Sequence, residues 1–332
     1  MTIRNIPTMI ASTLLVLTLC VPAFAQLPPD QLILAPAFSG RKVMAFDAFN
    51  GDVHDLDFIP YHESLIIPAA VEKGPIGIVL VSERAANAVY QFDYLTGEYL
   101  GVFAPWSGID TDIFHSPFGM FKLESPGPDS PNLLVVSGGS TGTNAFSVVE
   151  FNGGGTYVGT RVAPGAGGLD KPRGIVKRDD PFNDLLVTSM DTGVVHRFDL
   201  DGNPLSDFAV IEGGGRLEQI HVVPATGDVL VVVNTLAPMG IHRFTSDGTF
   251  VAILAPPGID KYKGVASLGN GNLLVTTNRD GVFEMDYDGN LIETMTDTHA
   301  GYPKLINITI SGEIFSDGFE SGNLEEWTES SP

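Results

Sequence analysis

Six segments of this chain follow one pattern: β-branched and aromatic residues lead to an aromatic or apolar anchor, and glycine follows within a few positions. The anchors are Phe46, Phe92, Phe151, Phe198, Phe244 and Met285. They are separated by 46, 59, 47, 46 and 41 residues. A repeat of about 48 residues suits a unit of four antiparallel strands and is far too long for the short repeats of a parallel β-helix. The sequence therefore predicts an all-β chain folded as a six-bladed β-propeller.

A nearly continuous apolar run precedes each anchor, as in residues 133–137 and 229–233. Such runs are typical of strands that neighbouring blades cover on both faces. Residues 304–311 form one further strand without an anchor, whereas the first unit begins directly at its second strand, residues 32–34. We therefore expect the C-terminal strand to pair with the N-terminal blade, because this pairing removes both open edges.

The first 25 residues have the pattern of a signal peptide. Arg4 precedes an apolar stretch at residues 9–21, and Ala23-Phe24-Ala25 supplies small residues for cleavage. The stretch is too short to span a membrane. Because the only cysteine, Cys20, lies within it, cleavage leaves a propeller at residues 26–315 that uses no disulfides. We expect export to the periplasm, the cell surface or the medium of a Gram-negative bacterium, with no transmembrane segment in the mature chain.

Acidic residues dominate the chain, which carries a net charge of −22. Loss of the first 25 residues removes Arg4 and no acid, so 307 residues with a net charge of −23 remain. Nucleic acids and anionic membranes both require a basic surface, and this charge argues against either as a partner.

Two segments, residues 193–203 (GVVHRFDLDGN) and residues 263–290, resemble the NHL-repeat and SMP-30 (gluconolactonase-like) propellers. The resemblance implies the six-bladed fold, and the lactonase members also hold a divalent metal with Glu, Asn or Asp near the starts of the innermost strands. The matching positions here carry Phe118, Arg173 and Lys263, and the nearest acid to the family's early glutamate is Glu63. An aromatic ring and two cations do not ligate Ca²⁺ or Zn²⁺, so the family's metal site is not expected in this chain.

The C-terminal segment, residues 316–332, is acidic and polar and contains the run DGFESG followed by Trp327. It resembles a short ending of many exported Gram-negative proteins. The resemblance implies a sorting or surface-retention element, and a frayed terminus is the plain alternative.

Basic residues gather in the loops that lead into the predicted innermost strands. The segment 170–174 (DKPRG) is repeated at 260–264 (DKYKG). Because the innermost strands begin at one mouth of the central channel, these positions predict a site for an anionic small molecule, glycan or peptide. The candidate residues are Arg173, Lys263, Lys304, Lys171, Glu63, Glu218, Phe118 and Trp106. The alternative is that the cations pair with acids such as Asp170, Asp260, Glu63 and Glu218 and only stabilise the loops.

Three histidines, His62, His115 and His299, also precede innermost strands of adjacent blades. Together with Glu63 they could hold a divalent metal that activates water, or one of them could act as a general acid or base. Either case would make the protein a hydrolase or lyase, and no other cofactor is indicated. A third interpretation is an adhesion or scaffold module at the cell surface.

The longest spacing between anchors, from Phe92 to Phe151, marks an insertion that is chiefly residues 106–131. Its content of Pro, Gly, Ser and Asp predicts a surface loop or lid beside the channel mouth. In that position Trp106 or Phe114 could stack on a bound ring.

Overall fold

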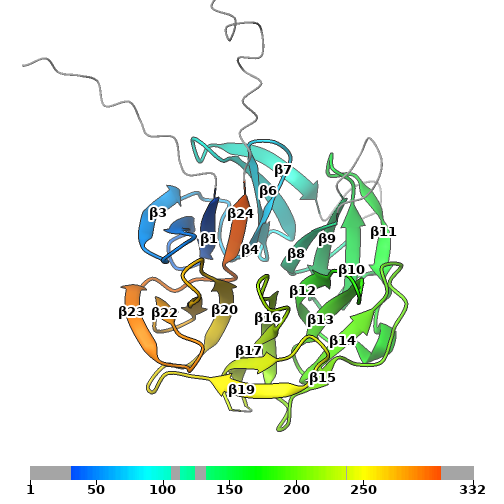
Figure 1. Ribbon diagram of the computed structural model, residues 1–332. Helices are drawn as coiled ribbons and strands as arrows, with labels where there is room; N and C mark the ends of the chain where they lie inside the picture. Colours follow the sequence, from blue (N-terminus) through cyan, green and yellow to red (C-terminus); the bar gives the residue numbers. More distant parts are fainter. Residues whose placement is uncertain (1–30, 106–112, 124–131, 237, 308–332) are drawn as a thin grey trace, which may run out of the picture.

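The chain folds into six four-stranded antiparallel sheets arranged radially about one axis, which confirms the predicted six-bladed β-propeller (Figure 1). The structure is a computed structural model that describes residues 31–105, 113–123, 132–236 and 238–307. Within those ranges the only helical element is η1, a 3₁₀ turn at Ala166–Gly168. None of the helical structure in the described ranges is long and apolar enough to cross a membrane.

The blades follow one another along the chain, and only the first combines strands from both ends. Blade one contains β24 (Lys304–Asn307), β1 (Gln31–Ala37), β2 (Lys42–Asp47) and β3 (Val53–Ile59). Blade two contains β4 (Pro68–Lys73), β5 (Ile78–Glu83), β6 (Ala88–Asp93) and β7 (Tyr99–Pro105). Blade three contains β8 (Pro117–Leu123), β9 (Asn132–Ser137), β10 (Ser147–Phe151) and β11 (Tyr157–Val162).

The other three blades have the same order from the channel outward. Blade four contains β12 (Pro172–Arg178), β13 (Asp184–Ser189), β14 (Val194–Phe198) and β15 (Ala209–Val210). Blade five contains β16 (Arg216–Val222), β17 (Val229–Thr235), β18 (Gly240–Phe244) and β19 (Phe250–Leu254). Blade six contains β20 (Tyr262–Ser267), β21 (Leu273–Thr277), β22 (Val282–Met285) and β23 (Leu291–Thr296).

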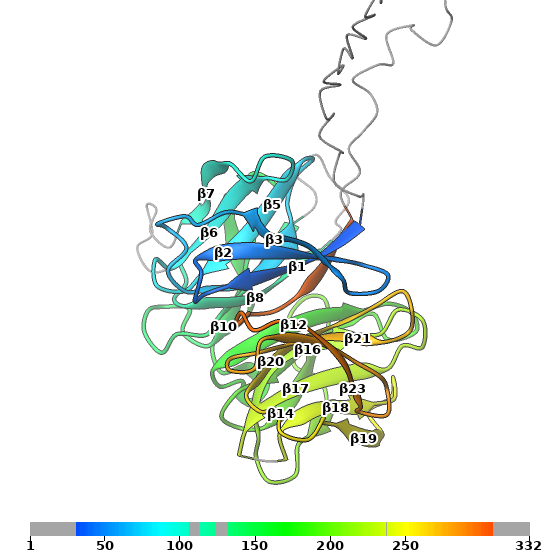
Figure 2. The ribbon, with the colours of Figure 1, turned by 90° about the vertical axis from the view of Figure 1, so that its left-hand side faces the viewer.

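Strand β24 closes the ring as expected. It pairs antiparallel with β1, with Lys304 opposite Leu34 and Asn307 opposite Gln31. The two strands lie side by side in both views (Figure 1, Figure 2). The C-terminal strand thus completes the N-terminal blade, and residues 308–311 of the predicted strand lie outside the described residues.

All six anchors occupy the third strand of their blade, where they are buried between neighbouring sheets. Phe92, for example, packs with Val79 and Tyr94 in one apolar cluster. Burying an aromatic side chain away from water contributes roughly 3 kcal/mol to stability through the hydrophobic effect. The repeated anchor therefore reflects a repeated packing position, which explains why its period predicted the blades.

Glycines allow the innermost strands of adjacent blades to approach closely. A Cβ on Gly119 would lie 2.7 Å from the carbonyl oxygen of Arg173, and one on Gly174 would lie 2.8 Å from that of Glu218. Only glycine fits such a close backbone approach without displacing the neighbouring strand. These glycines fix the level at which the residues before them, Phe118 and Arg173, stand around the channel.

The prediction that residues 106–131 form one surface insertion is wrong for the middle of this segment. Residues 117–123 form β8, the innermost strand of blade three, because their apolar side chains complete the core between blades two and four. Phe114, expected to stack on a ligand, is instead fully buried with its ring edge-on to Phe151. Trp106 and the remaining parts of the predicted lid, 106–112 and 124–131, lie outside the described residues.

Candidate functional site

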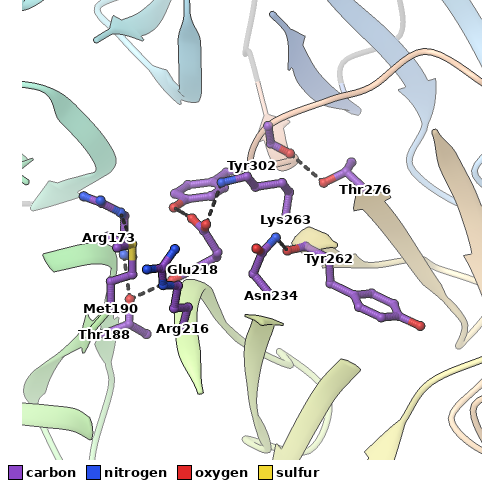
Figure 3. Close-up of polar contacts among 12 residues, drawn as sticks. Arg173, Thr188, Met190, Arg216, Glu218, Asn234, Tyr262, Lys263, Thr276 and Tyr302 are labelled. Atoms are coloured by element: carbon purple, nitrogen blue, oxygen red, sulfur yellow. Dashed lines mark hydrogen bonds and ion pairs between the residues drawn. The ribbon is translucent and has the colours of Figure 1, made fainter. Parts of the chain in front are cut away.

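Four residues from consecutive blades meet around the channel, near the mouth where the innermost strands begin; we call this end the front mouth. They are Phe118 on β8, Arg173 on β12, Glu218 on β16 and Lys263 on β20. Lys263 Nζ lies 2.6 Å from Glu218 Oε1, and the Arg173 guanidinium lies 3.6 Å from the centroid of the Phe118 ring. The structure therefore brings these four predicted residues together as two contacting pairs. Figure 3 draws the Lys263–Glu218 pair and Arg173.

A repeated hydrogen bond between blades holds this ring in register. Near the end of the second strand in four blades, a short polar side chain donates to a backbone carbonyl in, or just before, the innermost strand of the next blade. The donors and acceptors are Ser82 to Phe118, Thr188 to Glu218, Asn234 to Tyr262 and Thr276 to Gly301, at 2.6–2.8 Å. Three of these bonds are drawn in Figure 3. Because all four are buried, each fixes the strand that carries a ring residue.

The repeated basic motif has a backbone role in addition to its charge. Lys171 and Lys261 adopt φ values of 46° and 57°, and Ser116 in blade three adopts 48°. Each lies two residues before a ring position, where the left-handed conformation turns the chain into the innermost strand. The side chain of Lys171 forms an ion pair with Asp191 and does not join the ring.

Glu218 is the electrostatic centre of the ring. Its Oε2 accepts a 2.7 Å hydrogen bond from the hydroxyl of Tyr302, while its Oε1 contacts Lys263. Burial alone would raise the pKa of Glu218, but the charges of Lys263 and Arg173, with these hydrogen bonds, outweigh burial and hold the pKa below its ordinary value. Burial and the adjacent Glu218 charge raise the pKa of Tyr302 well above its ordinary value. The carboxylate is therefore ionised and fully engaged at neutral pH.

Arg84 is a site residue that sequence reasoning missed. It follows β5, and its guanidinium lies 4.1 Å from the centroid of the same Phe118 ring that Arg173 contacts. Its Nε donates to Ser116 Oγ at 3.2 Å. Arg84 lies two residues after Ser82, in the loop that follows β5, and the repeat contains no signal that singles out this position.

Neither guanidinium has a carboxylate within ion-pairing distance among the residues that the structure describes. Arg173 is only 8% exposed, and its Nε and Nη1 donate to Met190 Sδ and the carbonyl oxygens of Gly138 and Pro172. Burial lowers the pKa of Arg173, and the Glu218 charge opposes this shift. An arginine remains protonated under such conditions.

A cavity of about 350 Å³ opens at the front mouth beside these residues; we call it the front cavity. Its walls combine apolar and cationic groups, chiefly Phe38, Ile67, Arg84, Phe118, Lys263 and Tyr302. Two cations, Arg84 and Lys263, line the cavity, and of these Lys263 is paired with Glu218.

Lys304, expected at the same mouth, lies elsewhere. It lines a second cavity at the opposite end of the channel, where the innermost strands finish, and its Nζ lies 3.0 Å from Glu72 Oε2. In blade one the level of the ring is instead occupied by Gly301 and Tyr302, which line the front cavity. Arg173 and Lys263 are therefore brought together by the fold, and Lys304 is not.

The histidine candidates do not converge. His62 stacks on Tyr99 of the outer strand β7 with ring centroids 4.6 Å apart, and His299 lies 6.3 Å from the ring of Phe38. The backbone amide of His115 donates to Ser137 Oγ, and Glu63 is exposed. Among the described residues, no three or more His, Cys, Asp or Glu side chains are grouped so that they could hold a metal ion.

The alternative that the cations form ion pairs with nearby acids holds for three of the lysines, but two of the three pair with acids other than the expected ones. Lys263 pairs with Glu218 as that alternative held, whereas Lys171 pairs with Asp191 and Lys304 with Glu72. Asp260, in turn, pairs with Arg279 at 3.3 Å. Unlike these lysines, Arg84 and Arg173 have no carboxylate within ion-pairing distance among the described residues.

Comparison with known proteins supports the fold. No family model and no curated protein matches the sequence. A chain of the nidogen/laminin complex superimposes with a TM-score of 0.64 at 14% identity, covering 83% of this chain and 98% of that one. A candidate gluconolactonase gives 0.55 at 14% identity over 79% and 90% of the two chains, and a streptogramin B lyase gives 0.51 at 14% over 69% of each. At these identities the similarity shows the fold alone.

Proposed function

We propose that this protein binds an anionic ligand in the front cavity and acts as a binding protein, not as a catalyst. The observation that carries the proposal is the pair of guanidinium groups of Arg84 and Arg173, which face one phenyl ring and have no carboxylate partner among the described residues. Arg173 is largely buried and Arg84 is half-buried, and a cation in such a place without a direct carboxylate contact is costly. A ligand carboxylate or phosphate would supply that contact.

The ligand would also have an apolar or flat face. Phe38, Ile67 and Phe118 line the front cavity. Tyr302 also lines it, with its hydroxyl bound to Glu218. Ring systems and sugar faces pack against aromatic side chains of this kind. Anionic small molecules, uronic-acid glycans and acidic peptides all combine such a face with a negative group.

A binding role fits the ring better than acid–base catalysis. Its carboxylate, Glu218, is held by Lys263 and Tyr302 and keeps a lowered pKa, so it is a poor proton acceptor. The fold itself accommodates both roles, since its structural neighbours include a candidate gluconolactonase, a streptogramin B lyase and a chain of the nidogen/laminin complex. The signal-peptide pattern of residues 1–25 supports binding outside the cytoplasm.

Arg84→Gln is expected to weaken the binding of phenylacetate, a carboxylate with an aromatic body, by about tenfold, and Arg84→Gln with Arg173→Gln by about a hundredfold. Each substitution replaces a charge-assisted hydrogen-bond donor by a shorter, neutral polar side chain. Isothermal titration calorimetry at low ionic strength measures both affinities, and added salt should weaken the wild-type interaction.

Lys171→Gln serves as the matched control, because Lys171 is on the same face of the molecule but is already paired with Asp191. It should change the phenylacetate affinity less than threefold, a value set by the small contribution of exposed pairs. If Lys171→Gln and Arg84→Gln weaken phenylacetate equally, the interaction is with the general surface charge and the front cavity is not the site.

A further inference from the structure

The opposite end of the channel contains a cavity lined by the innermost strands, with a volume of about 530 Å³. We call it the rear cavity. Its apolar wall is formed by side chains of β8, β12, β16 and β24, namely Phe121, Val176, Ile220, Val222 and Leu305. Tyr302 lines both cavities and reaches Glu218 with its hydroxyl, so it lies between them.

His221 presents a hydrogen-bond donor to this cavity. The backbone N–H of Ser267 points at His221 Nε2 from 3.3 Å, and Ser267 Oγ lies 2.8 Å from the same nitrogen. Because a backbone N–H can only donate, Nε2 accepts, and the proton of the neutral ring is on Nδ1. Both hydrogen bonds of the ring to described residues involve Nε2, and His221 is a half-buried residue that lines the cavity.

Lys304 supplies a second donor beside it. Its Nζ contacts Glu72 Oε2 and lies 5.2 Å from the centroid of the Phe121 ring, and about a third of the side chain is exposed. An ammonium group has three N–H bonds, and one carboxylate contact leaves others for a ligand. Burial and the nearby charge of Lys304 lower the pKa of His221 to about 4, so the imidazole is neutral at physiological pH.

The charge balance of the rear cavity differs from that of the front cavity. Each cation that lines it is paired with a carboxylate: Lys304 with Glu72, Lys177 with Asp179 and Arg178 with Asp184, all within 3.0 Å. Asp180 also lines the cavity. An anion would therefore meet acids and gain no unpaired cation, whereas a neutral oxygen acceptor could use both donors at little electrostatic cost.

We infer that the rear cavity is a second binding site, for an uncharged molecule with an apolar body whose carbonyl oxygen accepts hydrogen bonds from His221 Nδ1 and Lys304 Nζ. The site is independent of the proposed anion site, because Tyr302 lies between the two and they share no donor. Amides, esters and ketones with an aromatic or aliphatic body have the required chemistry.

Phenylacetamide and phenylacetate distinguish the two sites, since they share a body and differ in charge. His221→Phe keeps an aromatic ring at this position but removes both ring nitrogens, including the Nδ1 donor, so it should weaken the binding of phenylacetamide about tenfold and leave that of phenylacetate unchanged. Arg84→Gln should do the reverse. Titration calorimetry of the wild type and both variants with both compounds gives the four comparisons.

A second measurement needs no variant. The ¹H–¹⁵N signal of His221 Nδ1 in the wild-type protein should shift and saturate as phenylacetamide is added, and it should not respond to phenylacetate. The inference is overturned if phenylacetamide shows no saturable binding, or if His221→Phe binds it as well as the wild type does. It is also overturned if phenylacetate shifts the His221 signal at lower concentrations than phenylacetamide does. Loss of phenylacetate binding alone would overturn the front-cavity proposal and leave this one standing.

Discussion

Ile306→Asp is expected to lower the melting temperature of the propeller by about 10 °C or more, because the substitution places an unpaired charge in the strand that closes the ring. Ile306 is 0% exposed, lies opposite Leu32 and belongs to the apolar cluster between blades one and two. A buried carboxylate without a partner costs several kcal/mol, and here it also loosens the contact between the two ends of the chain. Thermal unfolding followed by circular dichroism measures the effect.

Asn307→Asp is the matched control, since Asn307 is the next residue of β24 but is exposed. An exposed substitution of this kind should change stability by less than about 0.5 kcal/mol. If the two variants melt at the same temperature as the wild type, the pairing of β24 with β1 is not what holds the ring closed.

The architecture was predictable because the anchor residue that repeats in the sequence fills the same buried position in every blade. Phe92 and Phe198 are far apart in the chain, yet each fills the same buried position in the third strand of its blade. The closing strand was predictable for a related reason: residues 304–307 had strand character without an anchor, and the first unit lacked an innermost strand.

The site was predictable only where a blade carries the repeated motif. Phe118, Arg173 and Lys263 each precede a glycine that the close approach of the strands requires, and this spacing set their common level in the channel. Lys304 has no such glycine after it. Tyr302, two residues before the start of β24, lines the front cavity, whereas Lys304 lies farther along the channel, towards the rear mouth. The expected position of Lys304 at the front mouth was therefore wrong.

Arg84 and Tyr302 could not be found from periodicity because their roles depend on where long side chains reach. Arg84 extends from the loop after a second strand to the Phe118 ring of the next blade, and Tyr302 crosses towards Glu218 from the closing blade. Neither contact follows from a residue's place in the repeat. The sequence likewise showed acids near the cations but not which would pair, since Asp191 and Glu72 lie in other loops and strands than expected.

Glu218→Ala is expected to destabilise the protein by about 3–5 kcal/mol, because it leaves Lys263 and the Tyr302 hydroxyl without their common partner and removes the negative charge that favours the buried Arg173. Glu63→Ala, at an exposed glutamate, should be nearly neutral. Chemical unfolding in urea measures both. A double variant, Glu218→Met with Lys263→Met, should recover at least half of the loss, since replacing both partners of a buried pair by apolar groups removes the stranded charge.

The destabilisation caused by Glu218→Ala should become smaller as the pH falls. The pKa of Glu218 in the folded protein lies below its ordinary value of 4.5, so the folded state binds the proton less readily than the unfolded state. The contribution of Glu218 is therefore fully present above about pH 4.5 and is lost as the pH falls through the lower folded value. The free energies of unfolding of the wild type and of Glu218→Ala should accordingly differ most near neutral pH and converge in acid. A difference that stays constant between pH 7 and pH 3, or one that grows in acid, would show that Glu218 does not stabilise the ring as a carboxylate.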